Sequence, residues 1–152
     1  MSAVLRRSRE GFAAFREHVG VNFLTGEEAL SNAPLRALIV EDSMVIAMAA
    51  EDCLRDLGIG EVEITGCVED AMDAIDRTDF DMAILDYNLG DETSDAVANQ
   101  LAERSIPFAV ATGYGDMHSH FSQLGAVTVL IKPYNKADLH DLLRTVALAK
   151  AV

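Results

Sequence analysis

Five polar residues each stand directly after a short apolar run of the sequence: Glu41, Asp42, Asp86, Thr112 and Lys132. If those runs are neighbouring strands, three carboxylates meet within about 4–6 Å and repel one another unless a cation lies between them. Carboxylate oxygens of this kind suit Mg²⁺, which keeps several waters and often also binds a phosphate. A lysine ammonium and a threonine hydroxyl beside them could hold a phosphoryl group on Asp86, because phosphoryl transfer needs little beyond positioning and charge neutralisation.

Each of these residues also has an ordinary structural explanation. An aspartate after a strand commonly forms a turn, Glu41 and Asp42 could cap a following helix, and Lys132-Pro133 could simply end a strand. Five such residues at five matching positions are a less plausible coincidence than one shared site. The pattern therefore favours a single polar site with Asp86 as its nucleophile.

The elements that must position these residues follow from the alternation of apolar runs and amphipathic stretches. The predicted strands cover residues 35–40, 63–68, 81–85, 107–111 and 127–131. The predicted helices cover residues 43–57, 69–77, 93–104, 116–124 and 135–149. Strands that are apolar on both faces imply a parallel sheet covered by helices on both sides. We expect an α/β fold with a doubly wound five-stranded parallel sheet in the order 2-1-3-4-5, which binds ligands at its carboxyl edge.

Residues 1–34 do not follow this alternation, so we predict an N-terminal helical extension at 1–34 and a separate domain at 35–152. Leu5, Phe12 and Val19 recur every seven residues, which predicts an amphipathic helix. A capping-box pattern after this helix predicts a second, shorter one, with Thr25 and Glu28 as its paired residues.

The apolar stripe of this extension, which also includes Phe15, has three possible fates. An isolated helix of this length is marginal in water, so the stripe packs either on the chain's own domain or on the same segment of a second chain. The third possibility is a disordered tail. The seven-residue spacing slightly favours a homodimer through residues 1–34, although two to three heptads are short for a coiled coil.

Composition narrows the function classes. The 152 residues are 50% hydrophobic and 24% charged, which is typical of a folded globular protein. Residues 1–35 are neutral, so the net charge of −13 lies in residues 36–152 and argues against direct nucleic-acid binding. Cys53 and Cys67 lack metal-binding spacing and indicate thiols of the reducing cytoplasm. We find no secretory signal and no run of about 18 apolar residues, so no membrane contact is predicted.

Four short motifs together resemble those of the response-regulator receiver family of two-component signalling. They are Glu41-Asp42, Ile84-Leu85-Asp86, Ala111-Thr112-Gly113 and Ile131-Lys132-Pro133. The resemblance covers residues 36–149 and implies a flavodoxin-like receiver fold with Asp86 as phosphoacceptor. It implies that Asp42, Asp86 and the backbone carbonyl of Asn88 bind Mg²⁺, with Glu41 acting through water.

The same resemblance assigns roles on the far side of the site. Thr112 and Lys132 are expected to bind the phosphoryl group, and the peptide bond between Lys132 and Pro133 is expected to be cis. The implied phosphodonor is a histidine kinase or a histidine phosphotransferase.

Some residues depart from the commonest receivers. Residues 107–114 resemble those of single-domain receivers with a Phe-Ala-Thr-Gly-Tyr run, except that Val110 replaces the Phe of that run. Val129 stands where receivers usually carry a Tyr or Phe that swings inward on activation. Tyr114 is the nearest aromatic substitute, and packing at a helix cap is an equal alternative for it. Gly90 replaces the usual Pro after the acceptor loop, which should loosen that loop.

Two other functions use similar residues. Aspartyl-phosphate hydrolases usually carry a second Asp two residues after the nucleophile, where this chain has Asn88. A degenerate receiver that binds partners without phosphate would not need the intact set. We therefore expect a signalling module that catalyses only its own phosphorylation and dephosphorylation. No output domain follows Val152, so we expect output through a downstream protein partner or a phosphorelay. The four histidines are expected at the surface.

Overall fold

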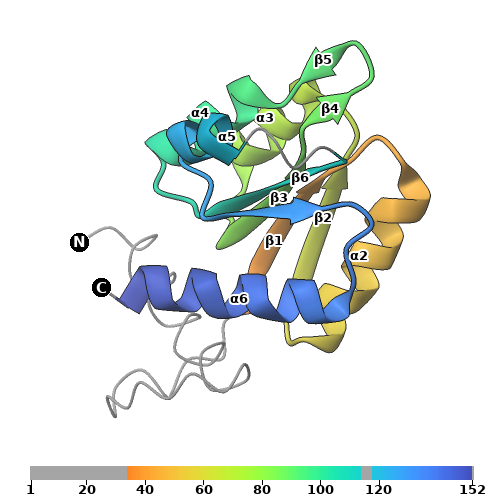
Figure 1. The fold of residues 1–152 in the computed structure, drawn as a ribbon, viewed down its shortest axis with the longest axis vertical. Helices are drawn as coiled ribbons and strands as arrows, with labels where there is room; N and C mark the ends of the chain where they lie inside the picture. Colours follow the sequence, from red (N-terminus) through yellow and green to blue (C-terminus); the bar gives the residue numbers. More distant parts are fainter. Residues whose placement is uncertain (1–33, 114–117, 152) are drawn as a thin grey trace.

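A computed structural model describes residues 34–113 and 118–151, which form a parallel sheet between two layers of helices (Figure 1). The strand order is β2-β1-β3-β6-β7, which confirms the predicted order. The strands are β1 (Arg36–Val40), β2 (Glu61–Thr65), β3 (Met82–Asp86), β6 (Phe108–Thr112) and β7 (Thr128–Ile131). The central strands β1, β3 and β6 are buried almost throughout, as apolar runs covered on both faces should be.

The helices divide between the two faces of the sheet. They are α2 (Met44–Asp56), α3 (Val68–Arg77), α4 (Asp95–Glu103), α5 (His118–Leu124) and α6 (Lys136–Ala151). In Figure 1, α2 and α6 cover one face and α3, α4 and α5 cover the other. Alternate strand residues accordingly supply two cores, with Ile39 and Ile84 in one and Leu38 and Leu85 in the other.

The caps of α2 agree with the sequence pattern. The Ser43 hydroxyl accepts a hydrogen bond from the Ile46 backbone N–H at 3.5 Å, and the helix ends before Leu57. Gly58 follows with φ 107°, a left-handed conformation that favours glycine. The start of α2 therefore lies directly after Glu41 and Asp42.

The second strand was predicted too late in the sequence. We expected it at residues 63–68, but β2 pairs with β1 from Glu61, opposite Arg36, to Thr65. The Arg36 and Glu61 side chains form an ion pair that fits this register. Val68 is the first residue of α3 and does not belong to the strand.

A small hairpin between β3 and α4 was not predicted at all. It consists of β4 (Asn88–Leu89) and β5 (Glu92–Thr93), which pair antiparallel. We expected a helix from residue 93, yet α4 begins only at Asp95. Gly90 takes φ 66° between the two strands, so it serves a turn conformation that few other residues adopt easily.

Other predictions fall partly outside the described residues. The N-terminal extension lies outside them, so the structure does not test the helix around Phe12 or the Thr25–Glu28 capping box. Tyr114 also lies outside them, and its alternative roles are untested. Within the described part of the chain, no helix is long and apolar enough to cross a membrane. The Lys132–Pro133 peptide bond is cis, as the resemblance implies.

Candidate functional site

Three carboxylates meet at the carboxyl edge of the sheet. Glu41 and Asp42 follow β1 and Asp86 ends β3, and oxygens of all three lie within 4.8 Å of one another. The strands are neighbours, and their parallel register brings the two ends together. Glu41 is 3% exposed and Asp86 is 7% exposed, whereas Asp42 is open to solvent. The cluster is therefore lined by buried carboxylates and opens on the side of Asp42.

Lys132 connects the two buried carboxylates. Its Nζ lies 2.9 Å from Glu41 Oε2 and 3.1 Å from Asp86 Oδ1. The other Glu41 oxygen accepts a hydrogen bond from the Ser43 backbone N–H at 3.1 Å. Both oxygens of Glu41 are thus engaged, so Glu41 holds the ammonium beside Asp86.

Burial and neighbouring charges at the site shift the pKa values of Glu41 and Lys132. Burial raises the pKa of Glu41, and the neighbouring Asp86 charge adds to this, although the Lys132 hydrogen bond opposes it. Burial lowers the pKa of Lys132, but its bonds to Glu41 and Asp86 outweigh burial and leave that pKa above the ordinary value. The lysine is therefore a permanent cation, while the carboxylates retain an unfavourable concentration of negative charge.

The remaining predicted residues lie around this cluster. Thr112 is buried at the end of β6, and its carbonyl accepts a hydrogen bond from the Lys132 backbone N–H at 2.8 Å. The backbone N–H of Tyr87 donates to the Ala111 carbonyl at 3.0 Å, which fixes the chain directly after Asp86. Asn88 opens β4 and is exposed. All of the predicted site residues that the structure describes are thus brought to one edge of the sheet.

The donor set fits a hard divalent cation. Carboxylate oxygens within 4.8 Å of one another match the ligands that Mg²⁺ prefers, and the exposed side at Asp42 leaves room for its retained waters. Burial and the Asp86 charge both disfavour ionised Glu41, so a cation would stabilise a carboxylate that Lys132 stabilises only in part.

Sequence reasoning missed a second polar cluster beside the site. The Tyr87 hydroxyl lies 3.4 Å from Asp95 Oδ2 and 3.3 Å from His120 Nε2, and that nitrogen lies 3.1 Å from Asp95 Oδ1. The Tyr87 ring also contacts Phe121 edge-on, with 4.9 Å between ring centroids. Burial and the Asp95 charge raise the pKa of Tyr87.

The side chain of His120 is 40% exposed, which agrees with the predicted surface position, but its pairing with Asp95 was not predicted. The cluster joins the residue after Asp86 to α4 and α5. No spacing in the sequence relates Tyr87 to a histidine 33 positions later.

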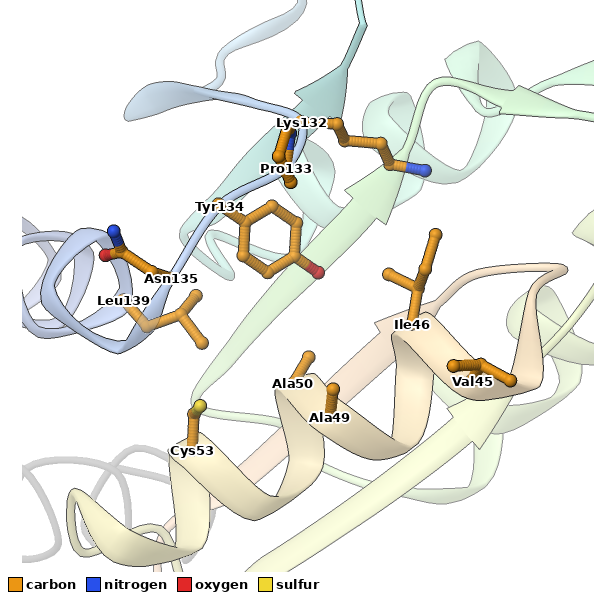
Figure 2. Close-up of a pocket in the computed structure, with 10 residues that line it drawn as sticks. All are labelled: Val45, Ile46, Ala49, Ala50, Cys53, Lys132, Pro133, Tyr134, Asn135 and Leu139. Carbon is orange, nitrogen blue, oxygen red and sulfur yellow. The ribbon is translucent and has the colours of Figure 1, made fainter.

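A cavity of about 380 Å³ lies on the other side of the site, between α2 and the segment after β7 (Figure 2). Figure 2 shows the Tyr134 ring directed toward Ile46 and Ala50 of α2, with the sulfur of Cys53 pointing into the same space. Burial, with the charges of Glu41 and Asp86, raises the pKa of Tyr134 to about 12. Tyr134 therefore borders both the apolar cavity and the acidic cluster.

Comparisons with known proteins show which family this fold belongs to. A family model described as response regulator receiver domain matches residues 37–144. The sensory transduction protein LytT of Bacillus anthracis is 31% identical over 117 residues, which cover 72% of this chain and 46% of LytT. The chemotaxis protein CheY-3 of Vibrio cholerae is 25% identical over 122 residues, which cover 76% of this chain and 94% of CheY-3.

A solved structure is similar to the same part of the chain. It is a CheY-like receiver domain from Methylobacillus flagellatus, with a TM-score of 0.67 and 27% identity, covering 74% of this chain and 98% of that domain. The chain spans only about half the length of LytT, so the two resemble each other in one region only.

Proposed function

We propose, from the premise that the chain belongs to the response regulator receiver family, that Asp86 accepts a phosphoryl group from a histidine kinase or histidine phosphotransferase. The observation that carries this proposal is the ammonium of Lys132, held between Glu41 and Asp86 at 2.9 and 3.1 Å. A permanent cation beside a buried carboxylate is placed to offset the charge that arrives with a phosphoryl group.

In the proposed step, an Asp86 oxygen bonds to phosphorus while the phosphorus–nitrogen bond of a phosphohistidine breaks. The electron pair returns to the donor's imidazole, which takes up a proton. Lys132 pairs with one phosphoryl oxygen, and the Thr112 hydroxyl donates a hydrogen bond to another. Asp42, Asp86 and the Asn88 carbonyl would hold Mg²⁺, with Glu41 acting through water, and the bound ion would supply further charge neutralisation.

The proposed domain at 35–152 is a signalling module that turns over no external substrate. Its output is contact with a downstream protein partner or onward transfer of the phosphoryl group. Both described cysteines are free thiols, which supports a reducing compartment such as the cytoplasm. Incubation with Mg²⁺ and acetyl phosphate, followed by intact mass measurement, tests the phosphoacceptor function directly.

The face that receives the phosphodonor is proposed to include the start of α2. Met44, Val45, Ile46 and Met48 are large apolar side chains that are exposed on this helix, and we call them the α2 patch. The patch follows Glu41 and Asp42 directly in the chain, so a protein that brings a phosphohistidine to Asp86 passes over it. Contiguous exposed apolar residues of this kind mark protein-binding surfaces.

We expect Mg²⁺ to raise the melting temperature progressively over the millimolar range. An ion that binds only the folded carboxylate cluster stabilises it by mass action. Asp42→Asn should remove most of this response, because it deletes a ligand without disturbing the core. Asp56→Asn, which changes an exposed carboxylate at the far end of α2, should leave this response intact. If Mg²⁺ left the melting temperature of the unaltered chain unchanged, the proposed metal site would be wrong.

We also expect phosphorylation to be transmitted through Thr112 and Tyr87 in place of Val129, which has no polar atom with which to respond. A phosphate mimic such as beryllofluoride should shift the backbone amide signals of residues 108–113 and 118–124. Tyr87→Phe keeps the ring but removes the hydroxyl that contacts Asp95 and His120. It should reduce the shifts in α5 while leaving those at the end of β6.

The matched control for this experiment is Tyr134→Phe, which removes a hydroxyl on the opposite side of the sheet. It should leave the α5 shifts at their original size. If Tyr87→Phe also left them unchanged, the proposed route from Asp86 to α5 would be wrong.

A further inference from the structure

The α2 patch and the cavity beside it form one continuous apolar surface. Val45 is 81% exposed, and both Val45 and Ile46 line the cavity as well as belonging to the patch. The cavity continues inward to Cys53 and Leu139, with Tyr134 above them (Figure 2). An aromatic side chain is much smaller than about 380 Å³, so the space accommodates one or two rings. Apolar surface of this kind is unfavourable in water unless another group covers it.

The structure points to an occupant within this chain: we propose that the apolar stripe of residues 1–33 docks on the α2 patch and places Phe12 and Phe15 in the cavity. These residues lie outside the described part of the chain, and their sequence predicts an amphipathic helix that is marginal in isolation. The inference rests on the proposed function, because it concerns access to Asp86.

The residues between the apolar stripe and Pro34, which we call the tether, are long enough to allow this contact. Pro34 lies against Gly60, where a Cβ built on the glycine would stand 2.7 Å from the proline Cβ. From there the segment has to pass α2, which at about 1.5 Å per residue is roughly 20 Å long. The 15 residues from Val19 to Pro34 span up to about 50 Å when extended, so the stripe reaches the cavity without strain.

The charges of the two surfaces are complementary. Residues 1–19 hold four arginines and two glutamates, whereas α2 holds Glu51, Asp52 and Asp56 against one arginine. A segment with two excess positive charges is thus tethered beside a helix with two excess negative charges. Attraction of this kind favours the docked orientation and rejects a segment of the opposite sign.

The seven-residue spacing alone slightly favoured a second copy of the chain, but the covalent connection to the cavity makes that copy the less favoured occupant. A short covalent connection gives the chain's own segment an effective concentration on the order of millimolar, above the concentration at which the protein is studied. The stripe also offers only two to three heptads, which is short for a stable coiled coil between chains. The segment therefore meets its own cavity before it meets a partner.

The consequence is a cover over the face that a phosphodonor protein has to reach. A protein donor competes with residues 1–33 for the α2 patch, so the cover lowers the rate of its phosphoryl transfer. Acetyl phosphate is small enough to reach Asp86 past the open side at Asp42 and is not affected. The cover thus selects donor proteins that bind the patch strongly enough to displace it.

Cys53 reports on the cover, because its sulfur lines the cavity (Figure 2). The experiment uses the full chain with Cys67→Ser, so that only one thiol reacts, and follows its modification by an aromatic disulfide reagent. Phe12→Ser with Phe15→Ser should make Cys53 react about tenfold faster, the factor expected if the segment fills the cavity for roughly nine-tenths of the time. Phe12→Leu with Phe15→Leu keeps the apolar stripe and should retain most of the protection.

Two controls separate the possible outcomes. In a Cys53→Ser background the same Phe12 and Phe15 changes should leave Cys67 reactivity unchanged, because Cys67 precedes α3 on another part of the surface. If Cys53 reacted equally fast in the Phe12→Ser, Phe15→Ser variant and in the chain with both phenylalanines, the proposal would be overturned. Protection that disappears on dilution also overturns it and assigns the cavity to a second copy. Failure of acetyl phosphate to modify Asp86 would instead reject the phosphoacceptor function and leave the Cys53 result standing.

Discussion

Asp86→Asn should abolish incorporation of phosphate when the chain is incubated with Mg²⁺ and acetyl phosphate. The substitution keeps the size of the side chain but replaces the nucleophilic oxygen with an amide, which forms no stable phosphoryl bond under these conditions. The bond between Lys132 and Glu41 does not depend on this residue, so the site should stay folded. Intact mass measurement should show one added phosphoryl group on the unaltered chain and none on the variant.

The matched control is Asp91→Asn in the hairpin after β3, where the carboxylate is exposed and lies in the loop that follows the site. It should become phosphorylated at the ordinary rate. An acid-labile phosphate that still appeared on the Asp86→Asn chain at the original rate would falsify the assignment of the phosphoacceptor.

Lys132→Ala should slow phosphorylation by acetyl phosphate about 100-fold, the size of effect seen when one donor to a developing negative charge is removed. The same change should leave Mg²⁺ binding intact or make it tighter, because the ammonium no longer competes for Glu41 and Asp86. A slower rate without weaker Mg²⁺ binding is the distinctive result. A substitution that merely unfolded the site would weaken both.

The control for this variant is Lys136→Ala, which removes an exposed lysine that pairs with Asp56 at 3.4 Å. An exposed pair of this kind contributes little, so both measurements should stay near their original values. Initial rates from intact mass and Mg²⁺ affinity from calorimetry are the two readouts. If the Lys132→Ala variant became phosphorylated at the ordinary rate, the ammonium would have no part in the transfer.

The sheet, and the edge at which its polar residues meet, could be predicted from the order of apolar and polar residues. Runs that are apolar at every position bury both faces of a strand, and parallel strands connected by helices must end on the same side. Those two rules placed Glu41, Asp86 and Lys132 together without any knowledge of side-chain contacts. The two rules were weakest for β2, which lies at the edge of the sheet and is only partly buried. For this reason its residues were predicted too late in the sequence.

How those residues pair, and what surrounds them, depends on packing between elements that are distant in the chain. Lys132 reaches Glu41 across 91 positions of sequence, and only the packed sheet shows that this bond holds the ammonium beside Asp86. The β4–β5 hairpin has two residues in each strand, too few to produce a periodic pattern.

The Tyr87–His120 contact and the cavity beside Tyr134 likewise depend on where separate helices come to rest on the sheet. Apolar periodicity states which side of a helix is buried but not which side chains from another element will meet it. That choice is made by packing between elements far apart in the chain, because side chains interlock only after the helices have docked on the sheet.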